Sequence, residues 1–132
     1  MLKFAEAGIE LSLDDYGSGY ANMNYMLLLP FKMIKIDKYI VWEAFANPKV
    51  SLVLAATITM IKSLGMSVLA EGVETKEQKE WLEEHGCDFL QGYYFSRPIP
   101  QDEYIEYLEK AICDNSEKYS GVLDYRKEKA KE

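Results

Sequence analysis

The fold class of this chain is decided by the stretch Phe31-Lys32-Met33-Ile34-Lys35-Ile36-Asp37. This stretch is a short, largely apolar run with the length of a β-strand, and its last residue is polar. Because successive strand residues point to opposite faces, Lys35 and Asp37 share one face while the two isoleucines share the other. We therefore predict a strand over residues 31–36 that carries charged groups toward its carboxyl end.

The same pattern recurs between residues 9 and 100, where a short apolar run is followed by a turn and then by helical spacing. Strands are predicted over residues 9–13, 31–36, 66–70 and 87–90. Helices are predicted over residues 20–29, 50–64, from an N-cap at Thr75 to a stop at Gly86, and over 102–112. The helix over 50–64 is apolar at Leu52, Val53, Ala56, Ile58 and Ile61, so we expect it to be well buried.

The polar residues at the strand ends distinguish between two kinds of parallel sheet, one open and doubly wound and the other closed as a barrel. Each predicted strand ends in charged or amide groups: Asp14 and Asp15, Lys35 and Asp37, Glu71, and Gln91. Functional groups at the carboxyl ends of several strands are typical of a (β/α)₈ barrel. An open sheet would concentrate them at one switch point.

Four βα units make up only half of such a barrel, which needs eight strands and about 250 residues. We therefore expect an α/β fold that is the C-terminal half of a (β/α)₈ TIM-type barrel, with an upstream half missing. The outer strands would need partners, from a homodimer or from the missing N-terminal half of the barrel. The expected domain covers residues 1–113, and residues 114–132 form a charged C-terminal helix or tail.

The composition of the chain argues against several classes of function and site. A formal net charge of -7 argues against binding to duplex nucleic acid, which requires basic groups. No apolar stretch approaches the ~18 residues that a membrane segment needs, and no signal peptide is present, so a cytoplasmic location is the default expectation. The spacing of Cys87 and Cys113 fits neither a zinc site nor a disulfide framework, and we expect free thiols.

The adjacent carboxylates Asp14 and Asp15 form the first candidate site, and the glycine-containing loop Tyr16-Gly17-Ser18-Gly19-Tyr20 follows them. Both can reach one site only where the strand is already turning. Two carboxylates at one point repel each other unless a cation lies between them, and their hard oxygen ligands select Mg²⁺ or Mn²⁺. The alternative is a loop or helix-capping pair of acids.

Lys35 and Glu71 are the candidate catalytic residues. A lysine inside an apolar run is costly unless it is paired or used. Beside carboxylates, Lys35 could bind a phosphate oxygen or an attacking water, the alternative being an edge-strand lysine in solvent. Glu71 could orient or deprotonate a metal-bound water. Glu74, three residues later, would stabilise the loop or cap the following helix.

The loop Gln91-Gly92-Tyr93-Tyr94-Phe95-Ser96-Arg97-Pro98 combines an amide, three aromatic rings and a guanidinium. Aromatic and guanidinium planes can stack on a purine, while Gln91 could bind a base edge or support the metal. The alternative is ordinary packing, which we favour for Phe95. For His85, at a predicted helix end, we expect a favourable contact with the helix dipole.

Four blocks of this sequence together resemble the EAL family of cyclic di-GMP phosphodiesterases. They are Asp14 to Tyr20, Leu29 to Asp37, Ala70 to Thr75, and Gln91 to Pro98. The resemblance covers residues 1 to about 112 and implies two-metal hydrolysis of cyclic di-GMP to the linear dinucleotide. It implies these roles: metal ligands for Asp14 and Asp15, contact with the nucleophilic water for Lys35, candidate base for Glu71, a loop-stabilising acid for Glu74 and a site-supporting amide for Gln91. From their positions beside Lys35 and in the loop after the last strand, Asp37 and Arg97 are further candidates for a substrate-binding or site-supporting role.

The sequence departs from the family pattern in one important respect. The Glu-Ala-Leu motif and further Asn and Glu ligands lie on the family's earlier strands, which this chain lacks, whereas Tyr16 and Ser18 only replace the commoner Phe and Thr. The resemblance therefore implies a domain that is incomplete and inactive as an isolated chain. The alternative is a non-catalytic module of bacterial signalling that binds cyclic di-GMP or a protein.

Overall fold

A computed structural model describes residues 2–17 and 23–114 of the chain. The chain divides into two compact units, Met1–Arg97 and Pro98–Glu132. The elements of the first unit are α1 (Leu2–Glu6), β1 (Leu11–Tyr16), α2 (Met23–Leu28), β2 (Phe31–Ile36), α3 (Lys38–Ala46), α4 (Pro48–Ser63), β3 (Ser67–Ala70), α5 (Lys76–Glu84) and β4 (Phe89–Leu90). The second unit contains α6 (Gln101–Asp114), and the predicted tail over 115–132 lies outside the described residues.

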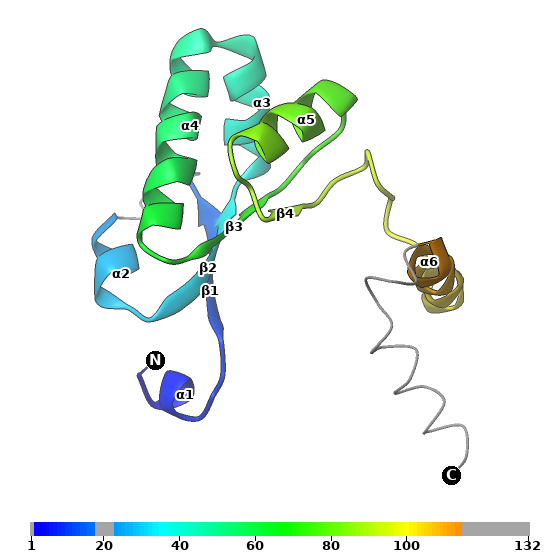
Figure 1. The fold of residues 1–132 in the computed structure, drawn as a ribbon, viewed down its shortest axis with the longest axis horizontal. Coiled ribbons are helices and arrows are strands. Elements are labelled where there is room, and N and C mark those ends of the chain that lie inside the picture. Colours follow the sequence, from blue (N-terminus) through cyan, green and yellow to red (C-terminus); the bar gives the residue numbers. More distant parts are fainter. Residues whose placement is uncertain (1, 18–22, 115–132) are drawn as a thin grey trace. The chain divides into compact units, whose positions relative to one another are not determined.

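The sheet in the described part of the chain has four parallel strands in the order β1-β2-β3-β4. Each strand therefore lies beside the next one in the sequence, and the order never reverses. Helices α3, α4 and α5 lie together on one side of this sheet (Figure 1). A sequential parallel order is the arrangement of a barrel segment, whereas a doubly wound sheet reverses its order at a switch point.

The predicted strands and helices are present, with shifted bounds. β1 continues to Tyr16, which pairs with Ile36 of β2, so Asp14 and Asp15 belong to the strand itself. The helix predicted over 50–64 begins earlier, at Pro48, because the Asn47 side chain accepts a hydrogen bond from the backbone N–H of Lys49 at 3.0 Å. The predicted helix over 20–29 is described from Met23 onward, since residues 18–22 lie outside the described part.

The hydrophobic core lies between the sheet and the helices. It is built from Ile34 and Ile36 of β2, Val68 and Ala70 of β3, Leu54, Ile58 and Ile61 of α4, and Leu82 of α5, all of them buried. Burying each large aliphatic side chain contributes about 1.5–3 kcal/mol. The core therefore joins β2 and β3 firmly to the helices that cover them.

The expectation that this helix is well buried holds for only one face of α4. Leu54 is 1% exposed, whereas Leu52 is 73% exposed and Val53 is 63% exposed. The helical period of 3.6 residues places Leu54, Ile58 and Ile61 on one face, and the two exposed side chains point away from it. The helix packs on the sheet through a single apolar stripe.

Of the two cysteines, the structure describes the side chain of Cys87 only. Cys87 is a free thiol, as predicted, and burial raises its pKa to about 12. A thiol with this pKa stays protonated at neutral pH and is a poor nucleophile. The prediction for Cys113 concerns a side chain outside the described ones.

We expect Leu54→Ala to lower the free energy of unfolding by about 2–5 kcal/mol, because it removes buried atoms and leaves a cavity beneath α4. Leu52→Ala, the matched control on the same helix, should change it by no more than about 0.5 kcal/mol. Urea denaturation followed by tryptophan fluorescence measures both values. Equal losses for the two variants would contradict the one-sided packing of α4.

Candidate active site

Asp14 and Asp15 lie where β1 bends. The register between β1 and β2 shifts between Leu13 and Tyr16, and Asp15 has a left-handed φ of 52°. Aspartate tolerates this conformation better than most residues, because its short polar side chain can bond locally. The bend allows adjacent carboxylates to serve one site, as expected for a strand that is already turning. One oxygen each of Asp14, Asp15 and Glu71 lies within 4.8 Å of the others.

Lys35 joins two of these carboxylates. Its Nζ lies 2.7 Å from Oδ1 of Asp14 and 2.6 Å from Oε1 of Glu71. β2 is flanked by β1 and β3, so Lys35 is on an inner strand and its side chain is only 24% exposed. The alternative of an edge-strand lysine in solvent is therefore wrong. Three neighbouring strands bring their charged ends to one point.

The contacts of Lys35 shift the pKa values of the groups involved. Hydrogen bonds from Lys35 to Asp14 first, and then to Glu71, raise the pKa of Lys35 from 10.5 to about 12. The same hydrogen bond lowers the pKa of Asp14 below its ordinary value of 3.8. The lysine contribution to stability is complete below pH 10.5 and is lost as the pH rises through about 12. Lys35 is therefore a cation throughout the physiological range.

The three carboxylates fit a hard divalent cation. Asp14, Asp15 and Glu71 can each supply one oxygen, and oxygen ligands suit Mg²⁺ and Mn²⁺. Because Lys35 already contacts Asp14 and Glu71, a metal ion would share these two carboxylates with the ammonium group. The donor set therefore passes the chemical test for a magnesium or manganese site.

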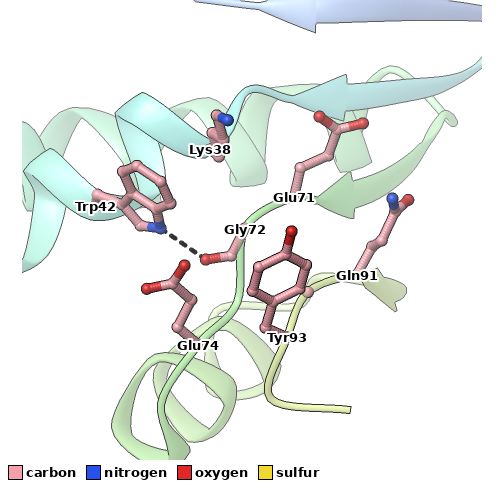
Figure 2. A pocket seen from close by; sticks show the side chains of 8 residues that line it. Lys38, Trp42, Glu71, Gly72, Glu74, Gln91 and Tyr93 are labelled. Carbon is pink, nitrogen blue, oxygen red and sulfur yellow. Dashed lines mark hydrogen bonds between the residues drawn. The ribbon is translucent and has the colours of Figure 1, made fainter. Parts of the chain in front are cut away.

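A pocket of about 220 Å³ adjoins this cluster on the side of Glu71. It is lined by Lys38, Trp42, Glu71, Gly72, Glu74, Gln91, Gly92 and Tyr93. Figure 2 shows the phenol of Tyr93 rising between Glu71 and Gln91 on one side and Trp42 and Glu74 on the other. The structure thus places three predicted residues, Glu71, Glu74 and Gln91, around one pocket.

The side chain of Gln78 holds the loop after β3 by accepting hydrogen bonds from the loop backbone. Oε1 of Gln78 accepts from the N–H groups of Glu74 at 2.7 Å and Thr75 at 3.1 Å. The hydroxyl of Thr75 accepts from the N–H of Gln78, which completes a capping box for α5. The N-cap is therefore Thr75, as predicted, and not Glu74, whose side chain faces the pocket.

Two further predicted residues lie at the edges of the site. Asp37 is 7% exposed and caps α3, where its Oδ1 accepts from the N–H of Tyr39 at 2.7 Å. Arg97 lies over the ring of Tyr93, 4.9 Å from its centroid. Asp37 is therefore connected to the pocket through α3, and Arg97 contacts an aromatic ring that lines the pocket.

Helix α3 itself was not predicted from the sequence, and with it Lys38, Trp42 and the close approach of Gly72 were missed. The available signal was Asp37 directly before an apolar-periodic segment, which is an N-cap pattern. The alternation of Asp37 with Lys35 instead favours a direct place in the site, but β2 ends at Ile36 and Asp37 caps α3. His85, by contrast, lies at the predicted helix end, where its Nδ1 is 2.7 Å from the carbonyl oxygen of Trp81.

The fold and the site define an α/β domain that is part of a (β/α)₈ barrel and bears a carboxylate–lysine cluster at its strand ends. The EAL domain model matches residues 1–98, and the chain belongs to the EAL domain family. Solved EAL proteins are its structural neighbours, which confirms the predicted fold class.

Curated relatives and solved structures show the same similarity. The chain is 41% identical over 103 residues to the signaling protein YkoW of Bacillus subtilis, covering 78% of this chain and 13% of that protein. It is 38% identical over 106 residues to the cyclic di-GMP phosphodiesterase NbdA of Pseudomonas aeruginosa, covering 80% of this chain and 14% of that protein. The chain thus spans about an eighth of the length of these two relatives.

Two of the similar solved structures are complexes with cyclic di-GMP. The PaMucR phosphodiesterase in complex with c-di-GMP matches with a TM-score of 0.72 and 32% identity, over 78% of this chain and 42% of that one. The manganese and cyclic di-GMP complex of Klebsiella pneumoniae BlrP1 matches with a TM-score of 0.66 and 35% identity, over 74% of this chain and 25% of that one.

Among the helices of residues 2–17 and 23–114, none has the length and apolar character required to cross a bilayer.

We expect the pKa of Asp14 to lie below 3.8 in the wild-type chain and to return toward that value in Lys35→Met, because the main hydrogen bond to the carboxylate is lost. The stabilisation from the pair is present above pH 3.8 and is lost as the pH falls through the lowered pKa. Carboxyl ¹³C NMR titration measures the shift. Lys62→Met is the matched control, since Lys62 pairs with Asp88 instead. An unchanged titration of Asp14 in Lys35→Met would contradict the pairing.

Proposed function

We propose that this chain forms part of a metal-dependent phosphodiesterase that hydrolyses cyclic di-GMP to the linear dinucleotide. The observation that carries the proposal is the position of Lys35, whose Nζ lies within hydrogen-bond distance of Asp14 and Glu71. A cation between two carboxylates at the ends of parallel strands suits the hydrolysis of a phosphate ester. The names of NbdA and of the PaMucR complex support this substrate for the family.

Asp14 and Asp15, with Glu71 beside them, would hold a divalent ion, for which we propose Mg²⁺ or Mn²⁺. When bound, the ion would supply Lewis-acid stabilisation of charge on the phosphate oxygens. The manganese complex of BlrP1 supports Mn²⁺ as the ion to test first. The ligands that this chain would contribute are two carboxylates on the bent strand β1 and a third directly after β3.

Lys35 and Glu71 would handle the attacking water. The ammonium group of Lys35 stays charged at neutral pH and can hold the water oxygen by donating a hydrogen bond. Glu71 is close enough to the same point to accept the water proton as the oxygen attacks phosphorus. The bond from phosphorus to the ester oxygen then breaks, the departing oxygen takes up a proton from water, and the product is a linear dinucleotide.

The adjoining pocket would take part of the nucleotide. Tyr93, with Arg97 stacked on it, offers a plane for a guanine base, and Gln91 offers an amide for the base edge or the metal shell. Glu74 would keep the loop and the pocket wall in place, and Asp37 would support the site through α3. Phe95 makes an edge-to-face contact with Tyr94, which agrees with a packing role.

The outer strands lead us to propose a partner. In the described sheet, β1 and β4 each pair with only one strand, so each offers an open row of backbone donors and acceptors. We propose that a second copy of the chain or the N-terminal half of a barrel supplies the further strands. We also propose a domain over residues 1–113 with a separate charged segment over 114–132, and a cytoplasmic location, where a nucleotide substrate is available.

A single copy of the chain should be inactive, because it lacks the further strands. Where a second copy supplies those strands, we expect incubation with cyclic di-GMP and Mn²⁺ to form the linear dinucleotide, which chromatography detects. Asp14→Ala should abolish the product, because it removes a proposed metal ligand and a partner of Lys35. Asp102→Ala, an exposed aspartate in the first turn of α6, is the control and should leave turnover unchanged.

The other outcomes separate the competing functions. Saturable nucleotide binding without turnover would identify a non-catalytic cyclic di-GMP-binding module. A folded dimer of the chain that neither binds nor hydrolyses the nucleotide would contradict both functions. Gel filtration with light scattering, run on the same sample, would show whether a second copy completes the sheet.

A further inference from the structure

The turn after β3 lies unusually close to α3. Nε1 of Trp42 donates a hydrogen bond to the backbone oxygen of Gly72 at 2.7 Å. Gly72 has a left-handed φ of 69°, and a Cβ at this position would lie 2.3 Å from Cβ of Lys38. Only glycine permits this approach, since a side chain would both strain the backbone and overlap α3. The first two turns of α3 therefore pack directly on the backbone that follows Glu71.

Hydrogen bonds hold the backbone of this turn on both sides of the Glu71 side chain. The N–H of Glu71 donates to the carbonyl oxygen of Ile36 at 3.0 Å, which ties the residue to β2. One residue further along, the carbonyl oxygen of Gly72 accepts the hydrogen bond from Nε1 of Trp42. The N–H of Val73 donates to the carbonyl oxygen of Gln91, also at 3.0 Å. These three contacts hold the backbone at and after Glu71, whose Oε1 lies 2.6 Å from Nζ of Lys35.

Trp42 is itself fixed in place. Its ring meets Tyr39 edge to face at 5.6 Å, and Nζ of Lys38 lies 5.5 Å from the ring centroid. Asp37 caps the helix that carries all three residues. Figure 2 shows the indole on the pocket wall, with its hydrogen bond to Gly72 and the carboxylate of Glu71 beyond that residue.

We propose that Trp42 is a positioning residue for Glu71, because its indole N–H holds the Gly72 peptide and thereby aims the carboxylate at the site. This inference rests on the proposed function, in which Glu71 binds the metal and accepts a proton. Core packing alone would not require the hydrogen bond or the place on the pocket wall. The second tryptophan, Trp81, stacks on His85 at 3.7 Å and meets Phe45 at 5.7 Å, and it does not line this pocket.

The test compares Trp42→Phe with Trp81→Phe in the full chain. Phenylalanine keeps an aromatic ring at position 42 but removes the donor to Gly72. We expect Trp42→Phe to weaken Mn²⁺ binding and to lower kcat, each by about tenfold, because outer partners of a ligand have effects of this size. KM for cyclic di-GMP should change little. Trp81→Phe should leave all three values unchanged, even if it lowers the thermal stability.

Electron paramagnetic resonance of free Mn²⁺ gives the metal affinity, and initial rates give kcat and KM. A Trp42→Phe variant that is less stable but keeps the wild-type Mn²⁺ affinity and kcat would overturn the proposal. So would an equal loss of Mn²⁺ affinity in Trp81→Phe, since that loss would reflect general damage to the fold.

A double-mutant cycle distinguishes a wrong positioning role from a wrong function. If the wild-type chain neither binds Mn²⁺ nor turns over, the proposed function fails, but the Lys35–Glu71 contact can still be examined by urea unfolding. Trp42→Phe and Lys35→Met should then be non-additive by at least about twofold in the unfolding equilibrium constant, because they act on one network. Additive effects would overturn the positioning role whatever the enzyme assay shows.

Discussion

The contact of one lysine with two carboxylates from the neighbouring strands is the interaction on which the site depends. Lys35 lies on β2, Asp14 on β1 and Glu71 directly after β3, and the ammonium group reaches both acids. A partly buried charge is tolerated only when it is paired, so the three strands must align their carboxyl ends. The adjacent isoleucines of β2 are completely or almost completely buried on the other side. A register slip of one residue would move the lysine into the core and is therefore excluded.

The same contact would allow an acidic protein to bind the anionic substrate that we propose for it. The chain has a formal net charge of -7, and the three carboxylates of the cluster add to the local negative charge. Lys35, with its pKa raised to about 12, neutralises part of that charge at every physiological pH. A divalent cation would neutralise the rest, so a phosphate ester could approach without strong repulsion. The electrostatics of the site and its fit to a metal ion thus have one common cause.

The pocket depends on a second element, the helix that follows β2. Asp37 starts α3 by capping it, and this helix brings Trp42 against the backbone of Gly72. Glycine at position 72 makes the approach possible because it has no Cβ to meet Lys38. The aspartate therefore matters to the site through the helix it begins. Its alternation with Lys35, which suggested a direct role, ends where the strand does.

The amino-acid sequence by itself determined the βα repeat, the four strands, the capping box at Thr75 and the residues that gather at the strand ends. These features follow from local patterns: apolar runs, turn residues and polar groups at fixed spacings. Only the tertiary structure decided that Lys35 pairs with both Asp14 and Glu71, that Leu52 and Val53 face solvent, and that Trp42 binds Gly72. Those contacts join residues from 21 to 36 positions apart or depend on which face of a helix meets the sheet. Periodicity shows that a helix has an apolar face, but the neighbouring elements determine which side chains are covered.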